Sequence, residues 1–583
     1  MTTDAVPTNI KGPFDGQPVV VDGFTSVPFR EGDDFLMTLV HPEWEAAVRQ
    51  QGGDPRAAAA PPTQTYRIDR VIGSHHQQVY LSRAPDGGYH TLPLVWDIVR
   101  TRWITRKSSF LTPPRDGFYH NTKLWNNGCI FCHNTGPRPR LQVQSSPLGT
   151  SYTWNSAVAE LGIACEACHG AGQAHVNKHR LPGKGAQERA ATPSAESDLS
   201  LADIVRPRLL SKERAVLMCA RCHGKMVARS EFDRGCLVEG DFFDPRDADY
   251  SRWYDVPALA ADQDYQEQTQ GKYFWSDGTP RTTALEYQGV TASACYQQGQ
   301  MTCFSCHSMH APHGSDPNDQ LRFADAAELP SAQHNRACTQ CHQSLTTEDA
   351  LAAHTHHAAG SAGSRCYNCH MPYQTYALHK RVRSHRITIP TADVTRQHGV
   401  PNACNQCHVD RSTDWTDRML AGWQNEGAAS AGRSDRAADD AAVFAASAEL
   451  SMVVEHALAG HALQRALAME QLGDPANFAV AGTQWRARIL LSALEDEYES
   501  VRLLAGQSLL RLPGFNEQTF DFLAAPAVRG RQVAALRQWA ATQDSEQARE
   551  QLARVLGTSP DHIEQQINAL RQRRNEVPVS INE

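Results

Sequence analysis

Residues 404–408 read Cys-Asn-Gln-Cys-His, and the same pattern of two cysteines separated by two residues and followed by a histidine occurs six more times upstream. We number these pentapeptides motif 1 (129–133), motif 2 (165–169), motif 3 (219–223), motif 4 (303–307), motif 5 (338–342), motif 6 (366–370) and motif 7 (404–408). Their cysteines are Cys129, Cys132, Cys165, Cys168, Cys219, Cys222, Cys303, Cys306, Cys338, Cys341, Cys366, Cys369, Cys404 and Cys407. The motifs use fourteen of the sixteen cysteines, so their spacing decides the class of fold.

Each motif carries the residues that attach a haem covalently. Two thiols add across the two vinyl groups of the porphyrin as thioethers, and the adjacent histidine is held beneath the ring, where it binds the iron. The motif histidines are His133, His169, His223, His307, His342, His370 and His408. Paired cysteines also build zinc sites, but zinc ribbons use such pairs two at a time, whereas here the number is odd and a histidine follows every pair. The sequence therefore predicts seven haem c groups with their iron.

Composition restricts the other classes. The chain has 583 residues, and its 56 Lys and Arg against 64 Asp and Glu give a net charge of −8, which argues against a nucleic-acid partner recognised by bulk charge. The sequence has no run of about 18 apolar residues, and no signal peptide is visible after Met1. Because haem c is attached outside the cytoplasm, we expect a periplasmic or otherwise extracytoplasmic protein.

A second axial ligand on each iron decides between electron transfer and catalysis, because an open sixth position admits a substrate. His310 lies three residues after His307, too close to reach over its own ring, and His175 follows His169 by six residues. Both are expected to bind a neighbouring haem. We predict distal ligands among six histidines, with Met309 and Met371 as alternatives: His76, His120, His175, His310, His357 and His385. No residue is singled out as catalytic.

We expect a mainly α-helical fold with extensive loops, in four parts. These are an N-terminal extension (1–62), a heptahaem cytochrome c domain (63–424) that begins with a small antiparallel sheet, a linker (425–438) and an α-helical HEAT-like segment (439–583). Strands are predicted over 65–72, 78–81 and 92–96, and a helix over 453–472 that ends at Gly473. The helical segment is either a docking solenoid or a cap on the haem block, and we expect its deletion from residue 437 to leave all seven haems attached.

Taken together, these residues resemble multihaem c-type cytochromes of the c-552/c-554 type, in the branch where helical repeats follow the haem block. The resemblance covers roughly residues 64–420 and rests on Gly73-Ser74-His75-His76, Leu92 to Asp97, Cys165 to Gly170 with His175, His370-Met371-Pro372, Ser384-His385 with Ile389-Pro390, and Pro401 to His408. It implies that His175, His310, His357 and His385 are distal ligands. It also implies a periplasmic or outer-surface electron carrier, with relatives that reduce or oxidise small nitrogen compounds.

Two functions from different classes fit these patterns. The first is an electron relay through seven mostly bis-histidine haems, with redox protein partners as donor and acceptor. The second is a multihaem oxidoreductase that converts a small nitrogen or sulfur oxyanion at one haem with an open site. A membrane-associated electron donor and a partner docked on the C-terminal helices are further candidates. The remaining cysteines, Cys236 and Cys295, form a disulfide or stay as small buried side chains.

Overall fold

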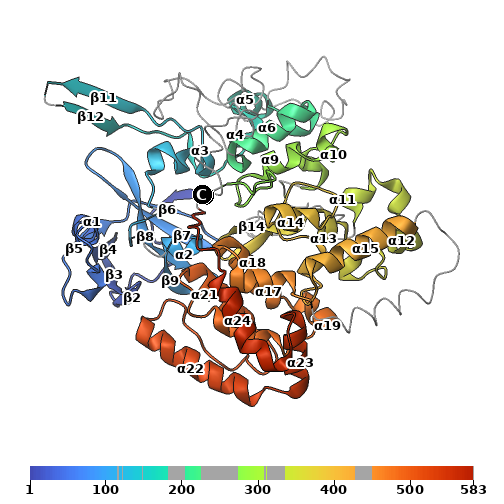
Figure 1. The fold of residues 1–583 in the computed structure, drawn as a ribbon. Helices are drawn as coiled ribbons and strands as arrows, with labels where there is room; N and C mark the ends of the chain where they lie inside the picture. Colours follow the sequence, from blue (N-terminus) through green and yellow to red (C-terminus); the bar gives the residue numbers. More distant parts are fainter. Residues whose placement is uncertain are drawn as a thin grey trace.

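The computed structural model describes residues 1–113, 117–120, 122–147, 149–180, 204–224, 273–307, 310, 335–426 and 449–581. All seven motifs lie within these ranges. Figure 1 shows three regions, with strands of the N-terminal part on one side, short helices of the motif region across the top and right, and the C-terminal helices below both. Cys236, Met309 and most of the predicted linker lie outside the described residues.

Two antiparallel sheets form the N-terminal region. One has the strand order β2-β3-β4-β5 and the other the order β1-β6-β7-β8-β9. Their bounds are β1 Thr2–Asp4, β2 Val19–Val21, β3 Phe24–Glu31, β4 Asp34–Val40, β5 Thr63–Arg67, β6 Arg70–Ile72, β7 Gln77–Arg83, β8 Tyr89–Asp97 and β9 Arg102–Thr105. The expected antiparallel sheet is present, but the strand predicted over 65–72 is divided between the two sheets.

Residues 1–62 are part of these sheets. Strand β1 pairs with β6 through Thr3 and Val71, and β4 pairs with β5 through Met37 and Tyr66. The boundary expected at residue 62 therefore crosses two strand pairs. A cluster of aromatic side chains joins the two sheets, because the ring of Phe14 packs edge-on against Phe35, Tyr80 and Trp103 at centroid distances of 5.2–5.8 Å.

The motif region consists of short helices and loops, as predicted. Most motifs coincide with one turn or two of helix: α3 (Cys129–His133), α4 (Glu166–His169), the end of α6 (Lys212–His223), 3-10 turns over Cys303–Ser305 and Cys404–Gln406, α11 (Arg336–Thr339) and α13 (Cys366–His370). Three two-stranded ribbons, which were not predicted, stand between them: β10 (Asn134–Thr135) with β13 (Glu160–Leu161), β11 (Leu141–Ser146) with β12 (Gly149–Trp154), and β14 (Tyr373–Ala377) with β15 (Lys380–Arg383). The β11–β12 ribbon projects from the body of the molecule (Figure 1).

Helices dominate the C-terminal region. Their bounds are α17 Met452–Ala459, α18 Ala462–Leu472, α19 Phe478–Ala481, α20 Arg486–Ser492, α21 Glu499–Leu510, α22 Pro526–Thr542, α23 Glu546–Val555 and α24 Ile563–Gln572. The single helix predicted over 453–472 is wrong, because it breaks at Gly460-His461, where His461 and Gln464 form a capping box that begins α18. The predicted end of that helix at Gly473 is confirmed.

The C-terminal helices share one hydrophobic core with the motif region. Leu111, Trp275, Tyr376, Val400 and Val409 belong to the same cluster of buried residues as the inner faces of α17, α18, α20 and α21. The chain then returns from α24 to pair Ile581 with Leu111, upstream of motif 1. The C-terminal helices therefore form a cap that shares its core with the motif region, and deleting them would expose apolar side chains of that region.

Polar contacts also tie this cap to the N-terminal region. Lys107 lies 3.4 Å from Glu499, and Ser500 Oγ donates to the carbonyl of Ser108 at 3.0 Å. None of the described helices is both long enough and apolar enough to cross a membrane.

Candidate haem-binding site

The seven motifs lie against one another in a continuous series of contacts. Cys132 Sγ donates to the carbonyl of Arg221 at 3.6 Å and Cys222 Sγ to that of Cys132 at 3.7 Å, which joins motif 1 to motif 3. The side chains of Cys219 and Cys303 join motif 3 to motif 4. Cys168 of motif 2 lies close enough to Cys222 for their charges to interact. Motif 3 is thus the junction at which motifs 1, 2 and 4 meet.

The series continues from motif 4 to motif 7. Gln340 of motif 5 donates to the carbonyl of Ser305 in motif 4 at 2.9 Å, and the thiols of Cys338 and Cys366 join motif 5 to motif 6. The side-chain amide of Gln406 in motif 7 bonds to the backbone of Tyr373, three residues after motif 6: its Oε1 accepts from the Tyr373 amide at 2.9 Å and its Nε2 donates to the Tyr373 carbonyl at 3.2 Å.

Four motif histidines each face a second histidine. The ring centroids of His169 and His310 are 6.0 Å apart, and those of His307 and His385 are 6.3 Å apart with planes inclined by 22°. His370 faces His354 at 6.3 Å, with planes inclined by only 6°. His408 faces His357 at 6.1 Å. In every pair the second histidine lies outside the motif, so segments distant in the sequence are brought to opposite sides of one space.

These separations fit a metal ion held between two imidazoles. A bond from a metal to an imidazole nitrogen is about 2 Å long, and the ring centre lies about 1 Å behind that nitrogen, so two axial rings have centroids about 6 Å apart. Within the described chain, no three or more His, Cys, Asp or Glu side chains converge as a cluster that could hold a metal ion. The recurring arrangement is the facing pair.

Backbone carbonyls fix the orientation of several of these rings. His169 Nδ1 donates to the carbonyl of Val205 at 2.7 Å, His370 Nδ1 to that of Thr388 at 2.8 Å, and His357 Nδ1 to that of Thr355 at 2.6 Å. Because a carbonyl only accepts, the proton is on Nδ1 and the lone pair is on Nε2, which is the nitrogen left for a metal. The residues present therefore fit the axial positions of an iron.

Burial keeps the ligands of two further motifs in the form that binds a metal. It lowers the pKa of His133 and of His408 to about 4, so both rings are neutral at pH 7. Burial also raises the pKa of Cys369 to about 11 and that of Cys404 to about 12, which keeps these thiols protonated in the unmodified chain.

A carboxylate orients His223, whereas backbone carbonyls orient His169 and His370. Its Nδ1 lies 3.1 Å from Oε2 of Glu286, the first residue of α9 (Glu286–Thr291). Burial alone raises the pKa of Glu286, but the hydrogen bond and the charge of His223 outweigh it, so the pKa is lowered and the group is a carboxylate.

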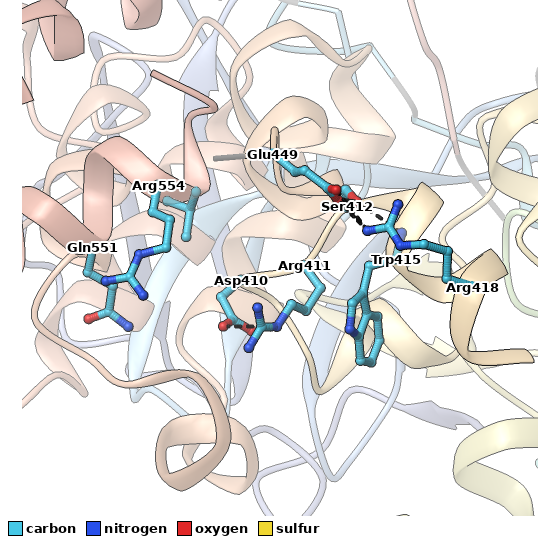
Figure 2. A pocket seen from close by; sticks show the side chains of 9 residues that line it. Asp410, Arg411, Ser412, Trp415, Arg418, Glu449, Gln551 and Arg554 are labelled. Carbon is cyan, nitrogen blue, oxygen red and sulfur yellow. Dashed lines mark hydrogen bonds and ion pairs between the residues drawn. The ribbon is translucent and has the colours of Figure 1, made fainter. Parts of the chain in front are cut away.

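Helix α15 (Thr413–Glu426) places a tryptophan against each member of the His408–His357 pair. The ring of Trp415 is 4.8 Å from that of His408, and the ring of Trp423 is 6.4 Å from that of His357. Trp415 also lines a hollow with Asp410, Arg411, Ser412, Arg418, Glu449, Gln551, Arg554 and Val555 (Figure 2). The indole therefore contacts the imidazole of motif 7 and also lines this hollow.

Most of the predicted site residues can be located. His310, His357 and His385, which were predicted, are brought opposite motif histidines, and so is His354, which was not among the predicted ligands. His354 lies on α12 (Glu348–Thr355), but nothing in its spacing separates it from its neighbours His356 and His357.

The six histidines stay predictions as distal ligands, and for the other three no facing motif histidine is described. His76 lies in the loop before β7, His120 in the turn that follows Gly117, and His175 on α5 (Gln173–Arg180). Cys295 is a free, partly buried thiol, and its pairing with Cys236 falls outside the described residues.

Comparison with known proteins gives one family match. The model of the family described as Cytochrome c552 matches residues 353–490, which contain motifs 6 and 7 with His354, His357 and His385. No curated protein matches. A solved structure titled "Crystal Structure of Outer Cell Wall Cytochrome OcwA" aligns over 93% of this chain and 94% of that chain, with 16% sequence identity and a TM-score of 0.36, which is too low to establish a shared fold.

The family match supports a c-type cytochrome. It indicates covalently bound haem c with its iron, and a role in electron transfer. The match covers a minority of the chain, so it supports this class of protein and leaves the number of haems open.

Proposed function

We propose that the chain is an extracytoplasmic electron-transfer protein that relays electrons through seven covalently bound, mostly bis-histidine haem c groups. The observation that carries this proposal is the set of four facing imidazole pairs, His169–His310, His307–His385, His370–His354 and His408–His357, at 6.0–6.3 Å. Haem iron held by two histidines has both axial positions filled and exchanges single electrons without binding a substrate.

The contacts between motifs support a relay order. Motif 1 contacts motif 3, which contacts motifs 2 and 4, and the series runs on through motifs 5 and 6 to motif 7. Groups attached to adjacent motifs would lie close together, so electrons entering at motif 1 or 2 would leave near motif 7. The redox partners at the two ends are proteins of unknown identity, and the attachment chemistry favours a periplasmic or other extracytoplasmic place.

The mass and the spin state of the loaded protein test this proposal. We expect the denatured protein to carry the mass of seven haems beyond its amino acids, and low-temperature EPR to give low-spin ferric signals from most of them. A denatured mass equal to that of the bare polypeptide would refute haem attachment. A stoichiometric high-spin signal that responds to carbon monoxide on reduction would instead favour the oxidoreductase with one open site.

Gly363 offers a test of the His408–His357 pair that leaves every histidine in place. A methyl group at Gly363 would overlap the Cγ and Cδ2 atoms of the His357 ring, so Gly363→Ala is expected to displace that ring and convert one haem to high spin. The change is measured as one added high-spin equivalent in EPR. Gly422→Ala is the control, because a methyl there meets nothing within 4 Å and its helix gains about 1 kcal/mol. An unchanged spectrum in Gly363→Ala would remove His357 from the axial position.

A further inference from the structure

Motif 3 combines a distinct position with a distinct hydrogen bond. It is the junction at which motifs 1, 2 and 4 meet, and its histidine bonds to a carboxylate, whereas His169 and His370 donate to backbone carbonyls. A carboxylate that accepts the Nδ1 proton of a metal-bound imidazole makes that ligand more basic than a neutral carbonyl does. Of His169, His223 and His370, the three motif histidines whose Nδ1 bonds are described, His223 is therefore the most electron-rich ligand.

The element that supplies the carboxylate is held firmly. Glu286 is mostly buried, with 21% of its side chain exposed, and α9 packs on α6, which carries His223. The other end of α9 is fixed against His385. Gly289 lies so close to the backbone after His385 that a Cβ at position 289 would be 2.8 Å from the amide nitrogen of Arg386. Just beyond the helix, Ser293 Oγ accepts from the amide of Ile387 at 2.9 Å.

Helix α9 therefore lies between the imidazole of motif 3 and the imidazole that faces motif 4. Its carboxylate sits where a negative charge acts on the metal site of motif 3 in a partly desolvated environment. There the charge favours the oxidised, more positive iron over the reduced one.

We infer that Glu286 is a positioning residue that lowers the reduction potential of the haem at motif 3, and so makes the junction of the relay its low-potential member. This inference rests on the proposed function. The haem at motif 3 would then be the hardest of these groups to reduce, and an electron placed on it would pass on readily to the haems of the neighbouring motifs.

The test is a potentiometric titration of the fully loaded protein, followed by EPR and visible absorption. Glu286→Gln removes the charge. We expect the reduction equilibrium constant of one haem to increase at least tenfold, which corresponds to a rise of about 59 mV in its potential for a one-electron couple. The component that moves is assigned with Cys219→Ala/Cys222→Ala, which lacks the thioether links of motif 3. Glu213→Gln is the matched control, because this exposed glutamate lies on the same helix as His223 and pairs only loosely with Lys212, at 4.0 Å.

Each outcome decides the inference. A shift confined to the motif 3 haem in Glu286→Gln, absent in Glu213→Gln, supports it. Seven unshifted potentials, or equal shifts in both variants, would overturn it while leaving the relay in place. If Glu286→Gln loses the haem, Glu286→Asp provides the second variant, because it keeps the charge but shortens the reach to His223. Loss of the haem from both variants would assign Glu286 to haem incorporation and overturn the tuning role. A protein with no covalent haem would refute the proposed function itself.

Discussion

Replacing His385 with alanine is expected to convert one haem of the loaded protein from low spin to high spin, with its thioether links intact. His385 faces His307 of motif 4 with nearly parallel rings, at 6.3 Å and 22°, and its removal would open one axial position. The backbone around His385 should keep its position when the imidazole is removed, because Gly289 and Ser293 hold this segment in place. The axial position would then be left open without a wider rearrangement. EPR would show one new high-spin equivalent, and the denatured mass would not lose a haem.

The control for this variant is another histidine of the same region. His398 lies at the end of α14 (Asp393–His398) and its Nδ1 is 2.9 Å from Ser276 Oγ, so His398→Ala should leave the spectrum low-spin. An unaltered spectrum in His385→Ala would mean that the facing rings are not an axial pair. His310→Ala makes the corresponding change opposite His169 and should behave in the same way.

The attachment sites could be predicted from sequence because their chemistry is local. Two thiols and a histidine within five residues specify a covalent site without any knowledge of the fold. The facing histidines are different, since each is brought to its partner by the tertiary structure. His310 and His385 were predicted from their neighbourhood and from a family resemblance, whereas His354 was missed because three histidines within four residues present the same local signal.

In the rest of the fold, too, features set by local sequence could be predicted, whereas features set by tertiary contacts could not. Strands β7 and β8 were predicted over 78–81 and 92–96 from their apolar runs. Strands β1 and β2 are only three residues long and depend on partners that lie later in the sequence, so their pattern carried no signal. The C-terminal segment was predicted to be α-helical, but a helical pattern does not say what covers each face of a helix such as α21. The structure packs this helix against α18, α20 and, through Ser500, the N-terminal region.

Removal of the Asp496 carboxylate is expected to lower the free energy of unfolding of the C-terminal cap by about 3–5 kcal/mol. Arg465 has only 1% of its surface exposed and donates to both oxygens of Asp496, at 2.8 and 3.1 Å, and Arg574 lies 3.5 Å from the same carboxylate. Asp496→Ala would leave the guanidinium of Arg465 buried without its counter-charge. The change is measured as a shift in the midpoint of denaturant unfolding, followed by far-UV circular dichroism of the loaded protein.

The adjacent residue is a matched control for that change. Glu495 is paired with Arg537 at 2.9 Å, but about half of each side chain is exposed, so Glu495→Ala should cost about 0–1 kcal/mol. Because α18 of the cap packs on β14 and β15 beside motif 6, the same Asp496→Ala protein should also lose haem from motif 6 or 7 when it is expressed. Equal midpoints for the two variants would show that solvent reaches Arg465 and that the cap is not the closed core described above. A large loss of stability with all haems retained would instead show that the haem block holds together without the cap.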